Sequence, residues 1–250
     1  MKTMFCLVML CYFNYEFTYS QYKEYPDWFL NPRKYKNLIV GIESDGKSAL
    51  ENASLYYTAY NRCIVKGDLY FISDEDDFKR QSDYFYETST VDYKKNLKML
   101  ETVDCFINSL INSKKICAFT LNKIELSVLK YKNVGDIKKP SWVDKVDSFD
   151  DNDYYFGVGE YTSQGDENEA WLTAEEKSVF SIIKMKQIKI TTLKYLEKNE
   201  EDEYLVSASK LKLKHSMKDI EILERYPDFE NKIFYVLSRI KKNNIKVLLK

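Results

Sequence analysis

The hydrophobic and polar positions of this chain predict short strands and two long helices. An apolar run, "NLIVGIES" at residues 37–44, contains Gly41, and the aromatic run "YYFGVGEYTS" at residues 154–163 contains Gly157 and Gly159. Each run precedes a helical pattern. The second pattern places small and apolar side chains on one helix face, at Trp171, Ala174, Ser178, Ile182 and Met185. Apolar residues in a strand-like pattern follow at 115–124 and 232–241.

These elements occur twice in the same order, which indicates an internal duplication. Each copy opens on a Pro-x-Trp entry, Pro26 and Trp28 in the first and Pro140 and Trp142 in the second. An alanine pair opens each helix, and residues 86–106 align with 206–226 without a gap. The paired positions of the two copies are Gly41 with Gly157, Ala49 with Ala170, and Ala53 with Ala174.

The duplication predicts an α+β fold of two tandem small domains, each a largely antiparallel sheet packed against helices. Strands and helices do not alternate strictly, which argues against a parallel α/β sheet. We expect a first domain at 21–130 (the first copy), a linker at 131–139, a second domain at 140–242 (the second copy) and a tail at 243–250. The acidic run at 147–153 is interpreted as a solvated loop.

Composition and charge narrow the function classes. The chain has 250 residues, is 44% hydrophobic and carries a net charge of −1 from 38 basic and 39 acidic residues. That balance gives no excess of positive charge that would attract nucleic acid, so we expect no nucleic-acid partner.

The first twenty residues resemble a signal peptide. Lys2 supplies a positive start, residues 5–13 are apolar but too short to span a bilayer, and Thr18-Tyr19-Ser20 offers a cleavage site before Gln21. Lipoprotein processing at Cys11 is the alternative, although Leu10 is larger than the residue that usually precedes a lipidated cysteine. We therefore expect an exported, periplasmic or outer-membrane-associated protein, with membrane association only if Cys11 is lipidated.

Cysteine and histidine usage indicates no metal, cofactor or catalytic set. Cleavage leaves Cys63, Cys105 and Cys117, an odd number without C-x-x-C spacing, which we interpret as buried free thiols. The lone histidine, His215, lies in a lysine-rich stretch and is expected on the surface. A zinc site and a Ser-His-Asp triad therefore lack their residues.

The segment Gly41–Ser48 matches the phosphate-binding P-loop pattern G-x-x-x-x-G-K-S. Gly41, Gly46, Lys47 and Ser48 are the nucleotide-binding candidates of this alternative. The corresponding turn of the second copy has no Gly-Lys-Ser, and an exported protein meets little nucleotide. We therefore interpret the glycines as permitting the turn from strand to helix, with Ser44, Asp45 or Ser48 capping the helix.

The combination of Pro-x-Trp, a glycine-containing strand and "GKS" before an alanine pair resembles the LPP20-type lipoprotein domain. That domain is similar to the N-terminal region of the flagellar ring protein FlgT. The matching residues are Pro26, Trp28, Gly41, Gly46, Lys47, Ser48, Ala49 and Ala53, then Pro140, Trp142, Tyr154, Tyr155, Gly157, Gly159, Ala170 and Ala174. The resemblance implies a bacterial cell-envelope protein with an α+β fold and without catalytic residues.

The expected function is a non-enzymatic scaffold or interaction protein of the cell envelope. Its partners would be envelope proteins or peptidoglycan-associated components. Two alternatives stay open: a P-loop nucleotide-binding protein, and a regulator of a peptidoglycan synthase or flagellar component. Trp28 and Trp142 are interpreted as caps packed over each sheet, with contact to a glycan or partner as the alternative.

Overall fold

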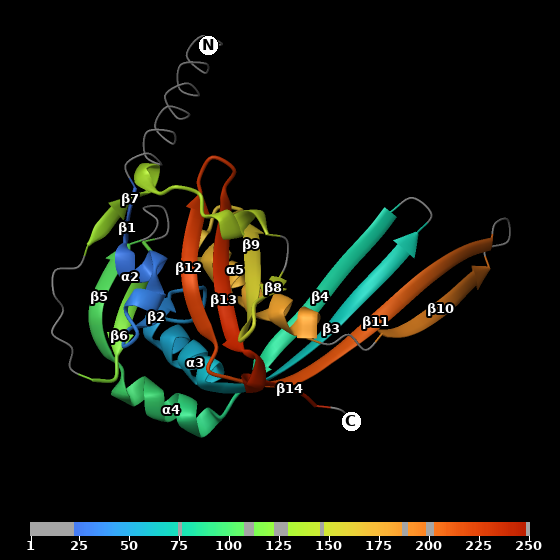
Figure 1. Cartoon of the computed structure of the whole chain (residues 1–250), viewed down its shortest axis with the longest axis horizontal. Coiled ribbons are helices and arrows are strands. Elements are labelled where there is room, and N and C mark those ends of the chain that lie inside the picture. The colour runs from blue at the N-terminus through green and yellow to red at the C-terminus, as the bar shows by residue number, and fades with distance from the viewer. Residues whose placement is uncertain are drawn as a thin grey trace, which may run out of the picture.

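The computed structural model describes residues 23–74, 77–107, 113–122, 130–145, 148–186, 190–198 and 203–248. The predicted signal peptide and Cys11 lie outside these residues. Figure 1 shows a globular body from which a group of long strands projects. The described elements before and within the first copy are β1 (Glu24–Pro26), α2 (Asp27–Leu30), η1 (Pro32–Lys34), β2 (Ile39–Ile42), α3 (Ala49–Asn61), β3 (Arg62–Asp74), β4 (Asp77–Glu87), α4 (Thr90–Met99), β5 (Glu101–Ile107) and β6 (Lys115–Thr120).

The second half of the chain repeats most of this arrangement. Its described elements are β7 (Tyr131–Asn133), η2 (Val134–Asp136), η3 (Ser141–Asp144), β8 (Ser148–Asp150), β9 (Tyr154–Thr162), α5 (Glu167–Lys186), β10 (Ile190–Lys198), β11 (Glu203–Lys218), β12 (Glu221–Asp228), β13 (Ile233–Lys241), η4 (Lys242–Asn244) and β14 (Ile245–Val247). The acidic run predicted as a loop therefore contains a short strand, because β8 pairs with β9.

The two copies have the same sheet topology. The strand order is β2-β6-β5 in the first copy and β9-β13-β12 in the second, and all neighbours are antiparallel. The register shifts once in β5, between Thr102 and Asp104, and once in β12, between Ile222 and Glu224. Those irregularities are 120 residues apart, which is the offset of the gapless sequence alignment. The predicted α+β class, with antiparallel sheets packed against helices, is confirmed.

The register corrects one detail of the alignment. Cys105 lies opposite Cys117, which lies opposite Gly41, whereas Arg225 lies opposite Val236, which lies opposite Gly159. Gly159 is therefore the counterpart of Gly41, and the predicted equivalence of Gly41 with Gly157 is wrong. Strand β2 continues past Gly41 to Ile42, and β9 continues past Gly159 to Thr162.

Glycine is required at both positions because a helix backbone lies very close to the strand. A Cβ atom on Gly41 would lie 2.0 Å from the carbonyl oxygen of Ala49, and one on Gly159 would lie 1.9 Å from that of Ala174. Ala174 thus occupies the place of Ala49, so the predicted pairing of Ala49 with Ala170 is off by one helical turn. Helix α5 begins at Glu167, seven residues before Ala174, whereas α3 begins at Ala49, so α5 extends further beyond the contact with its glycine.

The copies diverge between the third and fourth strands of each unit. Residues 90–99 form α4, while the aligned residues 210–219 lie largely within β11. Helix α4 starts at an N-cap, Ser89, whose side chain accepts a hydrogen bond from the Asp92 amide. Ser209 is aligned with Ser89 but pairs with strand neighbours on both sides. Tertiary pairing, rather than the capping residue, therefore decides the local structure here.

The two copies share one sheet. Hairpins β3–β4 and β10–β11 join in the order β10-β11-β3-β4, and β14 pairs with the base of β11. These are the strands that project from the body in Figure 1. The predicted tail thus contains a strand, β14, and the predicted linker contains another, β7, which pairs with β1. The two segments are parts of the fold rather than a simple connection and a free end.

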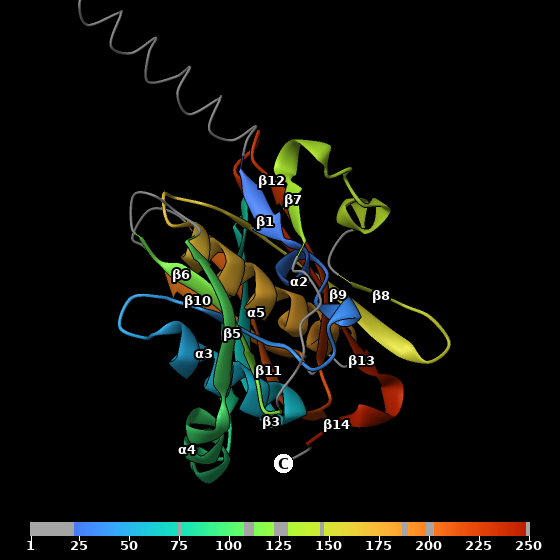
Figure 2. The ribbon, with the colours of Figure 1, turned by 90° about the vertical axis from the view of Figure 1, so that its left-hand side faces the viewer.

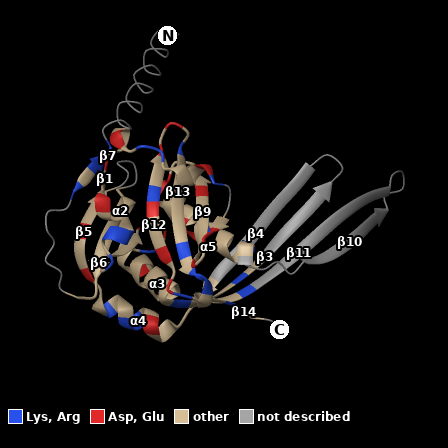
Figure 3. Ribbon diagram, in the orientation of Figure 1, with Lys and Arg blue, Asp and Glu red and all other residues tan. Residues whose placement is uncertain are grey.

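The main core lies where the two copies meet. Figure 2 shows α5 crossing the centre of the body, and its Trp171 and Ala174 join a buried cluster with Ile116 of β6 and Phe234 of β13. Tyr25, Trp28 and Phe29 complete the cluster from β1 and α2. Charges of both signs are interspersed along the described elements (Figure 3). The hydrophobic effect therefore acts across the boundary between the copies as well as within each.

We expect larger side chains at the helix–sheet contacts to destabilise both copies. Ala53 and Ala174 are fully buried, and Ala53 contacts the Gly41 position. Ala53→Leu and Ala174→Leu should each lower the free energy of unfolding by about 1–3 kcal/mol through overpacking. Lys47→Ala, at an exposed side chain, is the control and should stay within about 0.5 kcal/mol. Urea melts of the three variants test this, and a larger loss in Lys47→Ala would contradict it.

Candidate functional site

The segment that matches a P-loop forms a tight turn and a helix cap. Ser44 and Lys47 form an isolated β-bridge around a turn in which Gly46 has φ +79°. Ser48 is the N-cap of α3, and its side chain accepts a hydrogen bond from the Glu51 amide. The proposed cap at Ser48 is confirmed, and the preceding strand, β2, is antiparallel to its neighbour.

A carboxylate already occupies the start of α3. The Glu51 side chain accepts hydrogen bonds from the backbone N–H of Ser48 at 2.9 Å and from its hydroxyl at 2.8 Å. The bond from the Ser48 backbone is the main reason that the pKa of Glu51 lies below its usual value. A P-loop needs these groups for phosphate and magnesium. The capping box therefore uses the donors that nucleotide binding would require.

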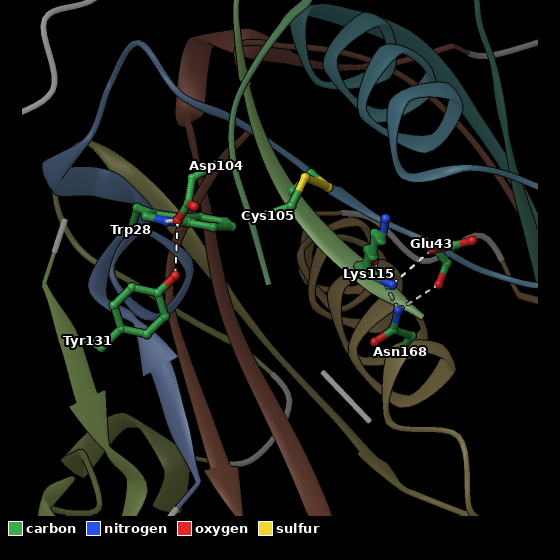
Figure 4. Close-up of a disulfide and its surroundings, with 8 residues drawn as sticks. Trp28, Glu43, Asp104, Cys105, Lys115, Tyr131 and Asn168 are labelled. Carbon is green, nitrogen blue, oxygen red and sulfur yellow. Dashed lines mark hydrogen bonds between the residues drawn. A yellow bond between two sulfur atoms is a disulfide. The ribbon is translucent and has the colours of Figure 1, made fainter. Parts of the chain in front are cut away.

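Trp28 is held by a carboxylate of the outer strand of its sheet. Its side chain is 1% exposed, and its indole nitrogen donates a hydrogen bond of 3.0 Å to Asp104 of β5. The hydroxyl of Tyr131, from β7, donates to the same carboxylate oxygen at 3.2 Å (Figure 4). Asp104 therefore anchors both the Pro-x-Trp entry and the segment that leads into the second copy.

The second copy repeats this contact at the equivalent positions. The indole nitrogen of Trp142 donates a hydrogen bond of 2.7 Å to Glu224, which lies 120 residues after Asp104. The other carboxylate oxygen of Glu224 forms a salt bridge with Arg33 of the first copy at 2.6 Å. Sequence reasoning missed both acidic residues, although the alignment placed an acidic residue at each position. Both indoles are buried, as expected of caps over the sheets.

A buried ion pair joins the copies. Arg225 of β12 pairs with Glu175 of α5, and both residues are at least 95% buried. Arg225 also donates a 2.8 Å hydrogen bond to the carbonyl of Phe29 and lies over the Phe29 ring. The Tyr60 hydroxyl, from α3, donates to Glu175 at 2.6 Å. The pair therefore contacts two elements of the first copy.

The start of α5 is tied to the edge of the first sheet. The Asn168 side chain donates a hydrogen bond of 2.8 Å to the carbonyl of Glu43 and one of 3.3 Å to that of Lys115 (Figure 4). The Lys115 amide in turn donates to the Glu43 carboxylate at 2.9 Å. These bonds fix α5 relative to β2 and β6, at the opposite side of the junction from Trp28.

The structure corrects the prediction of three free thiols. Cys105 of β5 and Cys117 of β6 lie opposite each other in the strand register and form a disulfide (Figure 4). Cys63 stays a buried free thiol, and desolvation raises its pKa to about 12. An odd number of cysteines excludes complete pairing but allows one pair, and only the strand register shows which two are adjacent.

The predicted surface position of His215 is wrong. The residue lies in β11 opposite Val65 and is 1% exposed. Its neighbours in sequence alternate between the two faces of a strand, so the lysines around it do not share its face. The expectation of a surface position followed from the number of lysines nearby and did not take this alternation into account.

Asp27 attaches the predicted linker to the first copy. Its buried carboxylate forms ion pairs with Lys132 at 2.7 Å and with Lys34 at 3.6 Å, and it accepts a hydrogen bond from Tyr35. Desolvation alone would raise the pKa of Asp27, but the hydrogen bond and charge of Lys132, with its other partners, outweigh it and lower the pKa. The carboxylate therefore stays ionised and holds β7 in place.

A cleft of about 540 Å³ lies beside β7, between the linker and β12. We call it the junction cleft. It is lined by Leu30, Asn31, Tyr131, Lys132, Asn133, Asp136, Ile137, Lys138, Pro140, Glu224 and Arg225. Its volume lies in the range of ligand-binding pockets, and its lining combines apolar side chains with charges of both signs. It is therefore the candidate binding site of the described residues.

The described residues contain no group of three or more potential ligands that would hold a metal ion, and no described helix has the length and apolar character of a membrane span. Comparison with known proteins gives no match to a family model, a curated protein or a solved structure.

We expect loss of the Trp28 anchor to destabilise the protein. Asp104→Ala leaves the buried indole N–H of Trp28 without its acceptor, which should cost about 1–3 kcal/mol of unfolding free energy. Asp136→Ala is the matched control, because this exposed carboxylate forms no ion pair within the described part of the chain, and should change stability by less than about 0.5 kcal/mol. Denaturant melts distinguish the two, and equal effects would contradict the anchoring role.

Proposed function

We propose that this chain is an exported, non-enzymatic protein of the bacterial cell envelope that acts as a scaffold or binds other envelope components. The observation that carries the proposal is the disulfide between Cys105 and Cys117. Disulfides persist in oxidising compartments such as the periplasm and are rare in the cytosol. The pair therefore supports the export that the first twenty residues predict.

The engagement of polar groups supports a non-enzymatic role. Ser48 and Glu51 cap a helix, Asp104 and Glu224 hold tryptophans, and Glu175 neutralises Arg225. A catalytic group needs contact with substrate and a free proton or electron pair. These polar groups bond to other elements of the described fold, so they are not available for such chemistry. A cleft at the junction, by contrast, suits the binding of a partner.

The LPP20-type resemblance supports the envelope location. Pro26 and Trp28, like Pro140 and Trp142, form equivalent entries over equivalent sheets, so the residues that carry the resemblance have a common structural role in both copies. Regulation of a peptidoglycan synthase or flagellar component is a more specific version of the same proposal. Identification of the partner protein would distinguish it from a general scaffold role. No observation favours the nucleotide-binding alternative.

The full chain, produced with a C-terminal tag in a bacterial host, tests the proposal. We expect it in the envelope fraction, with Gln21 as its first residue and with Cys105 joined to Cys117 in non-reducing peptide mapping. A variant without residues 1–20 is the control and should stay in the cytoplasm with reduced cysteines. An intact chain that starts at Met1 and is found reduced in the cytoplasm would contradict the proposal.

A further inference from the structure

Strand β7, which forms one wall of the junction cleft, has a free edge. Its backbone pairing with β1 includes bonds from the Asp27 amide to the Lys130 carbonyl at 2.8 Å and from the Val134 amide to the Lys23 carbonyl at 2.9 Å. Backbone groups alternate in direction along an antiparallel strand. Since residues 130 and 134 bond to β1, Tyr131 and Asn133 direct their N–H and C=O groups away from it.

The register of β1 agrees with this assignment. Pro26 lies opposite Tyr131, and proline has no N–H for a ladder hydrogen bond. Both Tyr131 and Asn133 line the junction cleft, and outside the β1–β7 ladder neither of their amides donates to a backbone carbonyl within the described ranges. The cleft is thus bordered by unpaired donors and acceptors two residues apart.

The opposite wall is also the edge of a sheet. Strand β12 is the outer strand of β12-β13-β9-β8, and Pro227 lies opposite Phe234 of β13. Proline is tolerated in a sheet where its nitrogen faces away from the neighbouring strand. Arg225 lies two residues earlier in the same strand, so its backbone groups have the same outward direction, and it too lines the cleft.

The side chains of the cleft suit a peptide rather than a single charged group. Leu30, Ile137 and Pro140 provide apolar contacts. Lys138 and Asp136 are exposed and form no ion pair within the described part of the chain. An extended peptide presents backbone groups at the same two-residue period as a strand edge and directs alternate side chains to one face.

We propose that the junction cleft binds an extended peptide segment of a partner protein, which adds as a strand to the free edge of β7. This is the β-augmentation mode, in which backbone hydrogen bonds supply affinity and side-chain contacts supply selectivity. The inference rests on the proposed function, because it locates the site at which an interaction protein would hold its partner. The peptide would place apolar side chains against Ile137 and Pro140.

Asn133 allows a test of the backbone contact itself. Its φ of −66° and ψ of 132° are values that proline adopts, so Asn133→Pro removes the outward N–H while retaining the strand conformation. The substitution also removes the side chain that accepts a hydrogen bond from the Gly135 amide. Asn133→Ala removes that same side chain but keeps the N–H, and is therefore the matched control.

The experiment selects a phage-displayed library of random linear peptides on the chain from residue 21 onwards. Binding of a selected, fluorescently labelled peptide is then measured by polarisation against both variants, after thermal melts have established that each is folded. We expect enrichment of sequences with apolar residues at alternate positions. Asn133→Pro should weaken binding by about tenfold or more, which corresponds to loss of a buried hydrogen bond, whereas Asn133→Ala should bind within about threefold of the parent.

Two results would overturn the inference. One is selection of no peptide, or only of peptides that free amino acids or acidic polymers displace as well as the unlabelled peptide does. The other is equal binding by Asn133→Pro and Asn133→Ala. If a peptide binds equally well to both variants at position 133, the β7 edge is not its binding site, although the protein still binds peptides. A cytoplasmic, reduced chain would instead reject the proposed function, so the two failures are distinguishable.

Discussion

The buried ion pair between Arg225 and Glu175 is the contact on which the junction of the two copies depends. A charge removed from water is costly unless it is paired and hydrogen-bonded, and breaking one partner of a buried pair costs about 3–5 kcal/mol. Arg225 meets this requirement only because Phe29 supplies a carbonyl and Glu175 a carboxylate, while Tyr60 supports Glu175. Elements of both copies must therefore be packed together before the pair can form. The same packing brings Arg225 into the lining of the junction cleft.

The duplication explains why the two halves of this junction differ. Cys105 and Arg225 occupy equivalent register positions, as do Cys117 and Val236. The first copy uses its pair of positions for a covalent link between its own strands, whereas the second copy uses Arg225 to reach the first copy. The Trp–carboxylate contacts, by contrast, are the same in both. At these two register positions, therefore, the copies have diverged in a way that lets the second copy contact the first.

Much of the architecture was predictable from the sequence because it depends on periodicity and repetition. The α+β class, the two copies and the Ser48 cap follow from local patterns. The disulfide and the burial of His215 do not, since each depends on which residues lie opposite across strands far apart in sequence. The sequence pairs Gly41 with Gly157 instead of Gly159 because two glycines, two residues apart, fit a short strand equally well until the register distinguishes them. The cleft could not be predicted because it depends on the pairing of β7 with β1, and the sequence indicates only a linker at that segment.

If the two copies form one cooperative unit around this ion pair, they should unfold together, which differential scanning calorimetry of the chain from residue 21 onwards measures directly. We expect a single transition in which the calorimetric and van't Hoff enthalpies of unfolding agree. Two separate transitions, or a calorimetric enthalpy well above the van't Hoff value, would show that the copies unfold independently and would contradict it.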